Sequence, residues 1–451
     1  KDLGFFAFPS PSSIIGKRQK CKKTSSNKIV SVVSSPKNKR SPSATGSVVF
    51  TFFPTKIPMT ATEKILARAA EKCEVRPGEN AWANVDVLMI NDITCPGISG
   101  IFKKEFGNTA KVWDREKIVV IPDHYIFTND ERAHRNVDIA RDFCVEQDIK
   151  YFYDIQDRSN FRANPDYKGV CHVALAQEGH CRPGEVLFGT DSHTTSAGAF
   201  GQFATGVGNT DAAFVLGTGK ILLKAKRMTL CNMVIEAGGK NGIVAADRTT
   251  YKYLEDKTSA PYEPVSSDEN ARQVLFLAQY RFDVSNMEPL VAKPHSPDNR
   301  ALARECNNVK IDRVYIGSCT GGKTEDFMAA AKVFLAGGKT VKVPTFLVPA
   351  TQKVWMDLYT LEVPDSGGKT CSMIFEEAGC DPPASPSCAA CMGGPRDTYG
   401  RLNEPQVCVS TTNRNFPGRM GHMEGQIYLA SPYTAAASAL TGFVTDPREF
   451  L

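Results

Sequence analysis

The chain has 451 residues, of which 42% are hydrophobic and 23% charged, and both values are ordinary for a globular protein. A chain of this length corresponds to two or three domains of about 150 residues each. No run of about 18 apolar residues occurs, which argues against a transmembrane segment.

The formal net charge of +5 is unevenly distributed. Residues 1–49 contain ten Lys and Arg and one acid, Asp2, so this stretch carries +9 and the rest of the chain carries −4. The remainder is therefore mildly acidic, and the chain offers no compositional argument for a nucleic-acid partner.

The basic stretch is rich in Ser and lacks the apolar core of a secretory signal, so residues 1–58 are predicted to be an organelle transit peptide. A disordered basic tail is the alternative. Because the sequence starts with Lys1 and not with Met, we expect it to be part of a longer chain. With such a leader, the fourteen cysteines are interpreted as thiols and not as a disulfide scaffold.

From about residue 60 onward, the pattern of apolar residues predicts alternating helices and strands. A helix is predicted over residues 62–70, with Thr62 as its capping residue, and further helices over 137–147 and 324–334. Short apolar runs at 85–90, 118–121, 186–188 and 314–316 are typical of buried parallel strands. This alternation favours an α/β fold with its chemistry at the carboxyl ends of the strands.

Two cysteines in the segment 385–394 are separated by two residues and surrounded by small residues. Cys388 and Cys391 can therefore bind one metal centre, although the same spacing also fits a zinc knuckle, a redox dithiol or chance. Cys319 follows the predicted strand 314–316 and enters a glycine turn, where either a metal ligand or a buried cysteine would fit. Three thiolates without a fourth suit an incomplete iron–sulfur cluster, whose open iron would act as a Lewis acid.

Histidines and carboxylates are adjacent after two of the predicted strands. Asp123 and His124 follow 118–121, while Asp191, Ser192 and His193 follow 186–188. His172 is predicted to lie in a similar place. A carboxylate fixes the tautomer of a histidine and raises its basicity, which suits acid–base catalysis; each histidine taken singly also fits a structural role.

Two arginines occur in the loop 412–419, which is rich in Asn, Pro and Gly. Arg414 and Arg419 can present planar guanidinium groups to the carboxylates of a diacid, or they can be solvated surface charges. Asn232 and Glu236 are four residues apart and would share one face if their segment is helical.

In this order, the motifs GTDSHT (189–194), IGSCT (316–320), CxxC (388–391) and NRNFPGR (413–419) resemble the aconitase superfamily, and within it the plant-type isopropylmalate isomerase large subunits. The resemblance covers residues 59–451. It implies a three-domain α/β core with parallel and mixed sheets around a cluster cleft, divided at 59–226, 227–305 and 306–451. It also implies a [4Fe–4S] cluster on Cys319, Cys388 and Cys391.

The same resemblance implies the roles of the other residues. The positions that match catalytic residues are Asp123, His124, His172, Asp191, His193 and Glu236. Those that match substrate-binding residues are Ser192, Asn232, Asn413, Arg414 and Arg419.

The implied reaction interconverts 2-isopropylmalate and 3-isopropylmalate by dehydration and rehydration in leucine biosynthesis, with a histidine such as His124 protonating the departing hydroxyl. In the family, the base that removes the carbon-bound proton is a serine on a swivelling domain. Because the chain ends at Leu451, we expect a small-subunit partner to supply that domain. A hydroxy-diacid substrate is expected, and neither nucleic acid nor a membrane.

The chain departs from the family pattern at one place. Between Lys224 and Arg227 the family has roughly fifty more residues, whereas here only Ala225 and Lys226 intervene. The second domain is therefore expected to be shortened, which puts its folding in doubt. The alternatives are a homoaconitase or aconitase, an inactive splice or gene-model variant with a binding or scaffold role, and zinc in place of the cluster.

Overall fold

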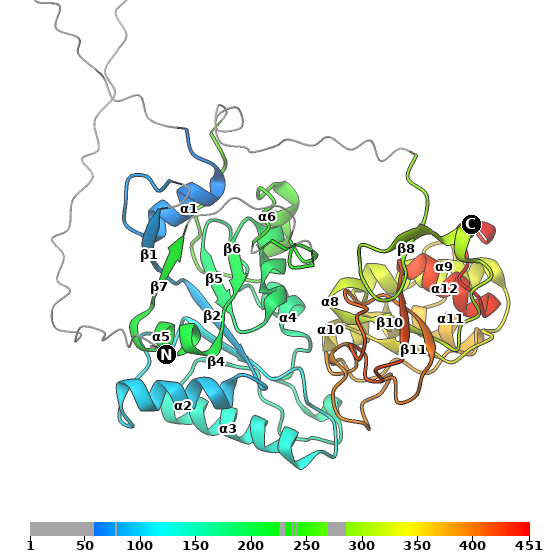
Figure 1. Cartoon of the computed structure of the whole chain (residues 1–451), viewed down its shortest axis with the longest axis horizontal. Helices are drawn as coiled ribbons and strands as arrows, with labels where there is room; N and C mark the ends of the chain where they lie inside the picture. The colour runs from blue at the N-terminus through cyan, green and yellow to red at the C-terminus, as the bar shows by residue number, and fades with distance from the viewer. Residues whose placement is uncertain (1–57, 77–78, 225–230, 237, 240, 269–285) are drawn as a thin grey trace, which may run out of the picture. The chain divides into compact units, whose positions relative to one another are not determined.

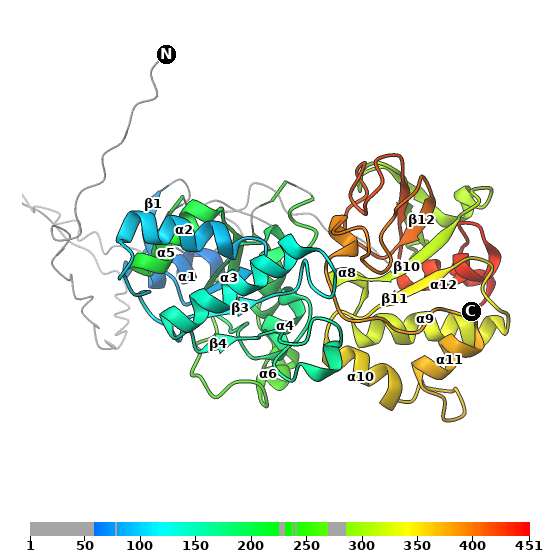
Figure 2. The same ribbon diagram turned by 90° about the horizontal axis from the view of Figure 1, so that it is seen from below.

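The computed structural model describes residues 58–76, 79–224, 231–236, 238–239, 241–268 and 286–451. The predicted leader, except for Pro58, and the Ala225–Lys226 junction lie outside the described residues. Residues 58–451 form one compact unit, in which two α/β regions can be followed (Figures 1 and 2). The finer divisions at 226/227 and 305/306 stay predictions.

The first region, residues 58–224, is built on a five-stranded parallel sheet in the order β4-β3-β2-β5-β6. Its strands are β2 (Val87–Asn91), β3 (Ile118–Ile121), β4 (Tyr151–Phe152), β5 (Val186–Gly189) and β6 (Phe203–Gly206). A separate antiparallel pair joins β1 (Asn80–Asn84) to β7 (Lys220–Lys224).

Both faces of this sheet are covered, which explains the continuous apolar runs in its strands. Leu88 and Ile90 face one core and Met89 faces the other, as the two-residue period of a strand requires. The first core includes residues of α2 and α3, which lie side by side in Figure 1, and the second includes residues of α4. The helices are α1 (Ala61–Ala69), α2 (Cys95–Phe106), α3 (Glu131–Gln147), α4 (Cys171–Gln177) and α5 (Asn209–Thr218). A 3-10 helix, η3 (Ser192–Phe200), follows β5, and α6 (Arg248–Leu254) lies later in the chain.

The second region, residues 286–451, has a mixed six-stranded sheet in the order β11-β10-β12-β13-β8-β9. The first four of these are parallel, and the two short edge strands are antiparallel. The strands are β8 (Leu290–Ala292), β9 (Arg300–Leu302), β10 (Arg313–Gly317), β11 (Thr345–Val348), β12 (Val407–Ser410) and β13 (Gln426–Leu429). The helices are α8 (Ser318–Gly321), α9 (Thr324–Gly337), α10 (Gln352–Thr360), α11 (Cys371–Glu377) and α12 (Pro432–Thr441).

Two helix starts differ from the prediction. The first helix is capped by Thr60 and not by Thr62, because the Thr60 hydroxyl accepts from the backbone N–H of Glu63 and the Glu63 carboxylate reaches back to Thr60. The helix predicted at 137–147 begins at Glu131, where Asp130 accepts from two backbone N–H groups. The polar residues between 131 and 136 concealed this first turn.

Candidate functional site

The sulfur side of the site comes from the second region. Cys319 lies in α8, directly after β10, and Ser318 before it has a left-handed backbone with φ of 78°. Cys388 and Cys391 are buried in the loop around the 3-10 helix Ala390–Met392, which ends at the left-handed Gly393. The prediction that Cys319 follows a strand is confirmed by this arrangement.

The thiols approach one another around shared polar neighbours. The Ser318 hydroxyl oxygen is 3.8 Å from the sulfur of Cys319 and 3.9 Å from that of Cys391. The amide of Asn413 also contacts both sulfurs, each at 3.8 Å. Burial and the neighbouring Cys391 raise the pKa of Cys388 well above its ordinary value. The three cysteines therefore surround one small volume.

The spacing of the sulfurs is wide. Two groups of described residues have metal-binding atoms that all lie within 4.8 Å of one another, Asp123–His124–Cys388 and His172–Asp191–His193; the three cysteines do not form such a group. Zinc bound by three thiolates at about 2.3 Å each would bring every sulfur pair within about 4 Å. The spacing thus favours a larger inorganic core over a single ion on all three sulfurs.

Three N–H donors point at these sulfurs. The Asn232 Nδ2 donor is 3.5 Å from Cys319 Sγ, the Asn413 Nδ2 donor is 3.8 Å from the same atom, and the Arg419 Nη2 donor is 3.5 Å from Cys391 Sγ. Burial raises the pKa of the Cys319 thiol to about 11, with a further contribution from Cys391. Such thiols stay protonated until a metal displaces the proton.

The acid–base side of the site comes mainly from the first region. Asp123 and His124 directly follow β3, and the His124 Nδ1 atom is 2.6 Å from an Asp123 carboxylate oxygen. The His124 Nε2 atom is 3.7 Å from Asp191. Burial alone would lower the pKa of His124, but the charge and hydrogen bond of Asp123 raise it well above its usual value. The Asp123 carboxylate therefore favours the protonated imidazolium of His124 over the neutral ring.

Asp191 is the centre of the histidine cluster. Its carboxylate is 2.8 Å from His172 Nε2 and accepts from the backbone N–H of His193 at 2.7 Å. Burial alone would raise the pKa of Asp191, but His172 and the hydrogen bonds from His124, His172 and His193 hold it well below the usual value. Asp191 is therefore a fixed negative charge among three histidines.

Glu236 extends this network to the arginine loop. Its Oε1 atom is 2.9 Å from His193 Nε2 and accepts from Arg414 Nε at 2.6 Å, and Arg414 Nη2 is 3.4 Å from the Ser192 hydroxyl. Burial alone would raise the pKa of Glu236, but His193 and Arg414 lower it. For His193, hydrogen bonds to Asp191 and Glu236 raise the pKa against the effect of burial.

One local prediction is wrong and one stated condition is not met, although the residues still reach the site. His172 does not follow a strand; it lies in the first turn of α4, where the chain leaves a bridge between Gly169 and Thr351. Asn232 and Glu236 are not on a helix, because residues 231–236 form turns. A turn can direct side chains four residues apart to different partners, and these two residues reach Cys319 and His193.

Two buried residues that hold the loops of this site were not predicted from the sequence. Asp92 is fully buried, and its carboxylate accepts from the backbone N–H groups of Asp123 and His124 at 3.0 Å and of Tyr125 at 2.8 Å. Tyr167 is also fully buried, and its hydroxyl donates to the carbonyl of Pro386 beside the CxxC loop. Asp92 follows β2, so the strand-end rule that identified Asp123 would have found it; nothing local marks Tyr167.

The sulfur side and the acid–base side are joined by direct bonds. The backbone N–H of Cys388 donates to the carbonyl of Asp123 at 2.9 Å, and the Asn413 amide is 3.5 Å from that of Asn232. The predicted site residues thus form two bonded sets. One set joins the histidines and carboxylates to Ser192, Arg414 and Cys388. The other joins Cys319 and Cys391 to Asn232, Asn413 and Arg419.

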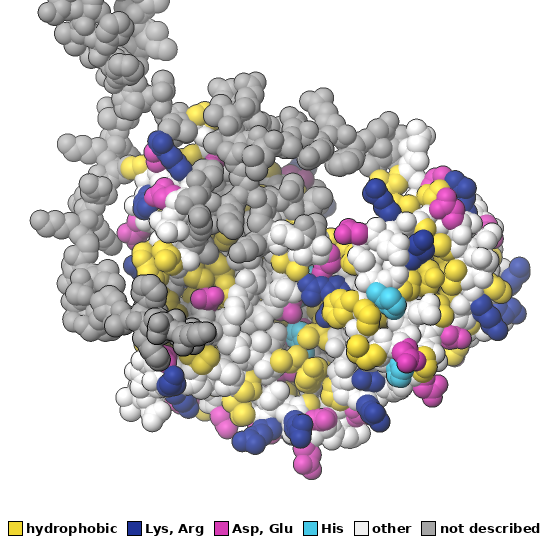
Figure 3. All heavy atoms as spheres, in the orientation of Figure 1, with side chains coloured by type: hydrophobic (Ala, Val, Ile, Leu, Met, Phe, Trp, Pro, Cys, Tyr) yellow, Lys and Arg dark blue, Asp and Glu magenta, His cyan; other side chains and the backbone are white. Residues whose placement is uncertain are grey.

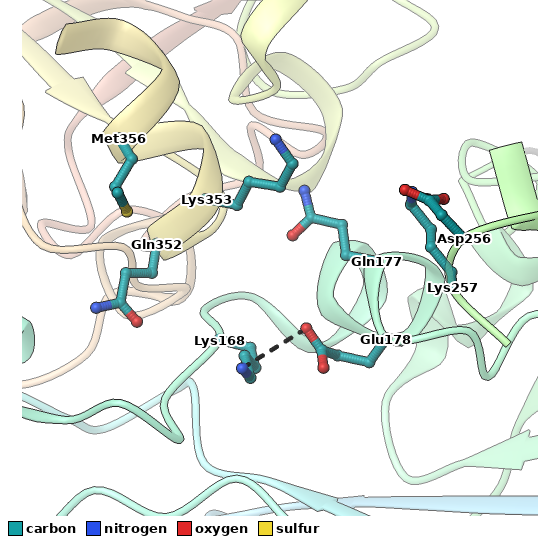
Figure 4. Close-up of a pocket in the computed structure, with 8 residues that line it drawn as sticks. All are labelled: Lys168, Gln177, Glu178, Asp256, Lys257, Gln352, Lys353 and Met356. Carbon is teal, nitrogen blue, oxygen red and sulfur yellow. Dashed lines mark hydrogen bonds and ion pairs between the residues drawn. The ribbon is translucent and has the colours of Figure 1, made fainter. Parts of the chain in front are cut away.

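A separate polar pocket of about 460 Å³ lies between α4 and α10 (Figure 4). Its charged side chains are already paired, Lys168 with Glu178 at 3.8 Å and Lys257 with Asp256 at 2.7 Å. None of the predicted site residues lines it. This pocket is therefore distinct from the cysteine and histidine cluster.

Comparison with known proteins agrees with this geometry. The model of the aconitase family (aconitate hydratase) matches residues 63–226, 220–308 and 301–442. The chain belongs to the aconitase family. This membership confirms the predicted α/β aconitase-like fold and the resemblance drawn from the motifs.

Two relatives within the family are named as 3-isopropylmalate dehydratase large subunits. The chain is 66% identical to the chloroplastic 3-isopropylmalate dehydratase large subunit of Arabidopsis thaliana, over all of this chain and 96% of that one. It is 38% identical to the 3-isopropylmalate dehydratase large subunit 1 of Methanopyrus kandleri, over 87% of this chain and 99% of that one. The holo-form of aconitase X from Thermococcus kodakaraensis has a TM-score of 0.37 at 13% identity, over 78% of this chain and 89% of that one, which adds nothing to the assignment.

The alignment with the Arabidopsis relative contains more positions than this chain has residues. It runs over 502 positions against 451 residues, a difference of 51. The first two family matches both include residues 220–226.

Family membership implies an iron–sulfur cluster, and the residues present fit one. Three buried or half-buried thiols converge from α8 and the CxxC loop, and they do not all lie as close together as the ligands of a single ion. N–H donors face the sulfurs as they do around metal-bound thiolates.

Proposed function

We propose that this chain is the large, catalytic subunit of a 3-isopropylmalate dehydratase. The observation that carries the proposal is the convergence of Cys319, Cys388 and Cys391 opposite a paired His–carboxylate network. The names of the curated relatives support the substrate and the place in leucine biosynthesis.

The cofactor is proposed to be a [4Fe–4S] cluster held by the three cysteines, with one iron free of protein ligands. When bound, the cluster supplies a Lewis-acidic iron for the substrate hydroxyl. Asn232 and Asn413 orient its sulfur ligands through N–H···S contacts.

Acid catalysis is assigned to His124. Its buried imidazolium is held by Asp123 and can pass the Nε2 proton to a departing hydroxyl. Asp191 fixes the orientation of His172 and His193, and Glu236 continues this chain of bonds to Arg414. The network holds its protons in place because every histidine has a carboxylate partner.

Substrate carboxylates are assigned to Ser192, Asn232, Asn413, Arg414 and Arg419. Arg414 lies beside the Ser192 hydroxyl, so these two residues can bind one carboxylate between them. The base that removes the carbon-bound proton is assigned to a small-subunit partner with a swivelling domain, in keeping with the large-subunit names of the relatives.

The chain is proposed to act in the chloroplast stroma, without nucleic-acid or membrane partners. The basic, Ser-rich leader and the chloroplastic relative, which aligns over the whole chain, support the plastid. Basic and acidic side chains are interspersed on the face shown in Figure 3, and none of the helices in the described residues is long and apolar enough to cross a membrane.

A second candidate is an inactive variant of the same subunit. It is favoured by the 51 extra alignment positions and by the overlap of the family matches at 220–226, which fit a segment missing near Ala225–Lys226. Most of the proposed site residues precede this junction or lie well after it, but the missing segment would remove packing from the second of the three family domains.

The test is anaerobic reconstitution followed by an isomerase assay with the small subunit of the relative. Turnover only when both subunits are present supports the proposal. Turnover by the large chain alone contradicts the split site, and a loaded cluster without turnover in either case identifies the inactive variant. A parallel chain that carries the relative's extra segment is the matched control.

A further inference from the structure

Arg419 has an unusual set of neighbours for a half-buried cation. Its Nη2 donor is 3.5 Å from the Cys391 sulfur, and its buried Nε atom has no hydrogen-bond partner. Within the part of the chain that the structure describes, Arg419 forms no ion pair with a carboxylate within 4.0 Å. Arg414, five residues earlier in the same loop, is paired with Glu236 at 2.6 Å.

The two arginines differ in how their positive charge is compensated. A guanidinium taken out of water costs free energy unless a negative partner compensates it. Arg414 has such a partner in Glu236, whereas Arg419 contacts a sulfur and the ring of Phe416, whose centroid is 5.7 Å from its guanidinium carbon. A metal-bound thiolate carries negative charge and accepts N–H donors, so the position suits Arg419 once Cys391 is a ligand.

We propose that Arg419 is a positioning residue of the cluster, which donates an N–H···S hydrogen bond to Cys391 and raises the reduction potential of the bound iron. This inference rests on the proposed cluster and goes beyond the carboxylate-binding role assigned to Arg419 above. Its remaining donors stay free for substrate.

The expected effect follows from charge. A cation that donates to a ligand sulfur stabilises the reduced cluster, which carries one more negative charge than the oxidised cluster. The Ser318 hydroxyl and the Asn413 amide also contact Cys391, but both are neutral. Removal of Arg419 therefore removes the one cation whose hydrogen bond to Cys391 the structure describes.

The test is a reductive titration of the reconstituted full-length chain with dithionite, followed by EPR, for wild type, R419Q, R419K and R414Q. In R419Q the reduced cluster is expected to be stabilised about ten-fold less, which lowers the midpoint potential by about 59 mV for one electron. R419K should recover part of the loss. R414Q removes a cation of the same loop that does not touch sulfur, and should shift the potential by less than half as much.

Two results would overturn the inference: an unchanged potential in R419Q, or equal shifts in R419Q and R414Q. If R419Q takes up no cluster, the R419K variant is used to test the inference, because lysine keeps the positive charge but lacks the planar guanidinium group. R419K should then show a smaller fall in potential and an altered deuterium shift of its Fe–S stretching bands, and wild-type values for both would overturn the inference. A wild-type chain that binds no cluster refutes the proposed function instead.

Discussion

The two α/β regions contribute opposite kinds of chemistry to the candidate site. The first region and the turn at 231–236 contribute histidines and carboxylates that are already paired with one another, such as His124 with Asp123 and His193 with Glu236. The second region contributes three thiols, approached by amide and guanidinium donors. The acid–base side is thus compensated mainly by its own pairs and by Arg414. On the sulfur side, the Asn232 and Asn413 amides also have oxygen partners, whereas the Arg419 donor is directed at sulfur.

Two contacts connect the acid–base side to the sulfur side. The Cys388 N–H to Asp123 bond sets the CxxC loop against the Asp–His turn, and the Arg414–Glu236 pair crosses in the other direction. Changes to the three cysteines should abolish cofactor binding, while changes on the acid–base side should leave the cofactor in place.

The largest effect is expected from the sulfur side. C319S and C391S should lose the cluster and, with it, Lewis-acid stabilisation worth several kcal/mol, so that turnover falls by about 10³-fold or more. Iron content and visible absorption measure the cofactor. C380S, a half-buried cysteine outside the site, is the matched control and should keep both. A C319S chain with full iron content would show that Cys319 is no ligand.

On the acid–base side, H124Q should keep the cluster but lower kcat by about 10²–10³-fold, the range of general acid catalysis. The pKa of His124 is raised, and its proton is the one that the departing hydroxyl takes up, so activity should fall as pH rises through that raised value. The pH profile of kcat measures this alkaline limb, which H124Q should lack. The control is H134Q, because His134 lies in α3 outside the network. If H124Q kept the alkaline limb unchanged, His124 would not be the general acid.

Changes to the Arg414–Glu236 pair should have a smaller effect, on the free energy of unfolding and on KM. R414Q removes one of the two partners of the buried Glu236 carboxylate and leaves His193 in place, so it should cost about 1–2 kcal/mol, less than breaking a fully buried pair because the Arg414 side chain is 22% exposed. The midpoint of thermal unfolding and KM for 3-isopropylmalate are the measurements. In the double variant E236Q/R414Q the two stability losses should be less than additive. Full additivity would mean that the pair is not coupled.

The smallest effect is expected at a polar contact between the regions that lies away from the chemistry. Asp397 accepts from the Thr128 hydroxyl at 2.6 Å and from the Asn129 N–H at 2.7 Å, and D397N should cost about 1 kcal/mol. Burial would raise the pKa of Asp397, but these two donors lower it, so its contribution is present above the unfolded-state pKa and is lost as pH falls through the folded-state value. Unfolding midpoints from neutral to acidic pH should converge for wild type and D397N, with D365N as an exposed control. If the difference between the unfolding midpoints of wild type and D397N grew as pH falls, the predicted direction of the Asp397 contribution would be wrong.

Much of this arrangement could be predicted from local sequence. The run 118–121 matches β3 because four apolar residues stand between Lys117 and Pro122, and the strand-end rule then led to Asp123 and His124. Local patterns failed where tertiary contacts decide: residues 231–236 form turns, and His172 lies in a helix. The bonds from Cys388 to Asp123 and from Tyr167 to Pro386 join residues more than two hundred positions apart, which no local period encodes.

The most direct test is the iron and acid-labile sulfide content of the anaerobically reconstituted chain, combined with EPR after mild oxidation. A cluster held by Cys319, Cys388 and Cys391 with one unclaimed iron should give about four iron and four sulfide per chain, and oxidation should release a single iron and leave a paramagnetic three-iron core. One metal ion per chain without sulfide would contradict that assignment.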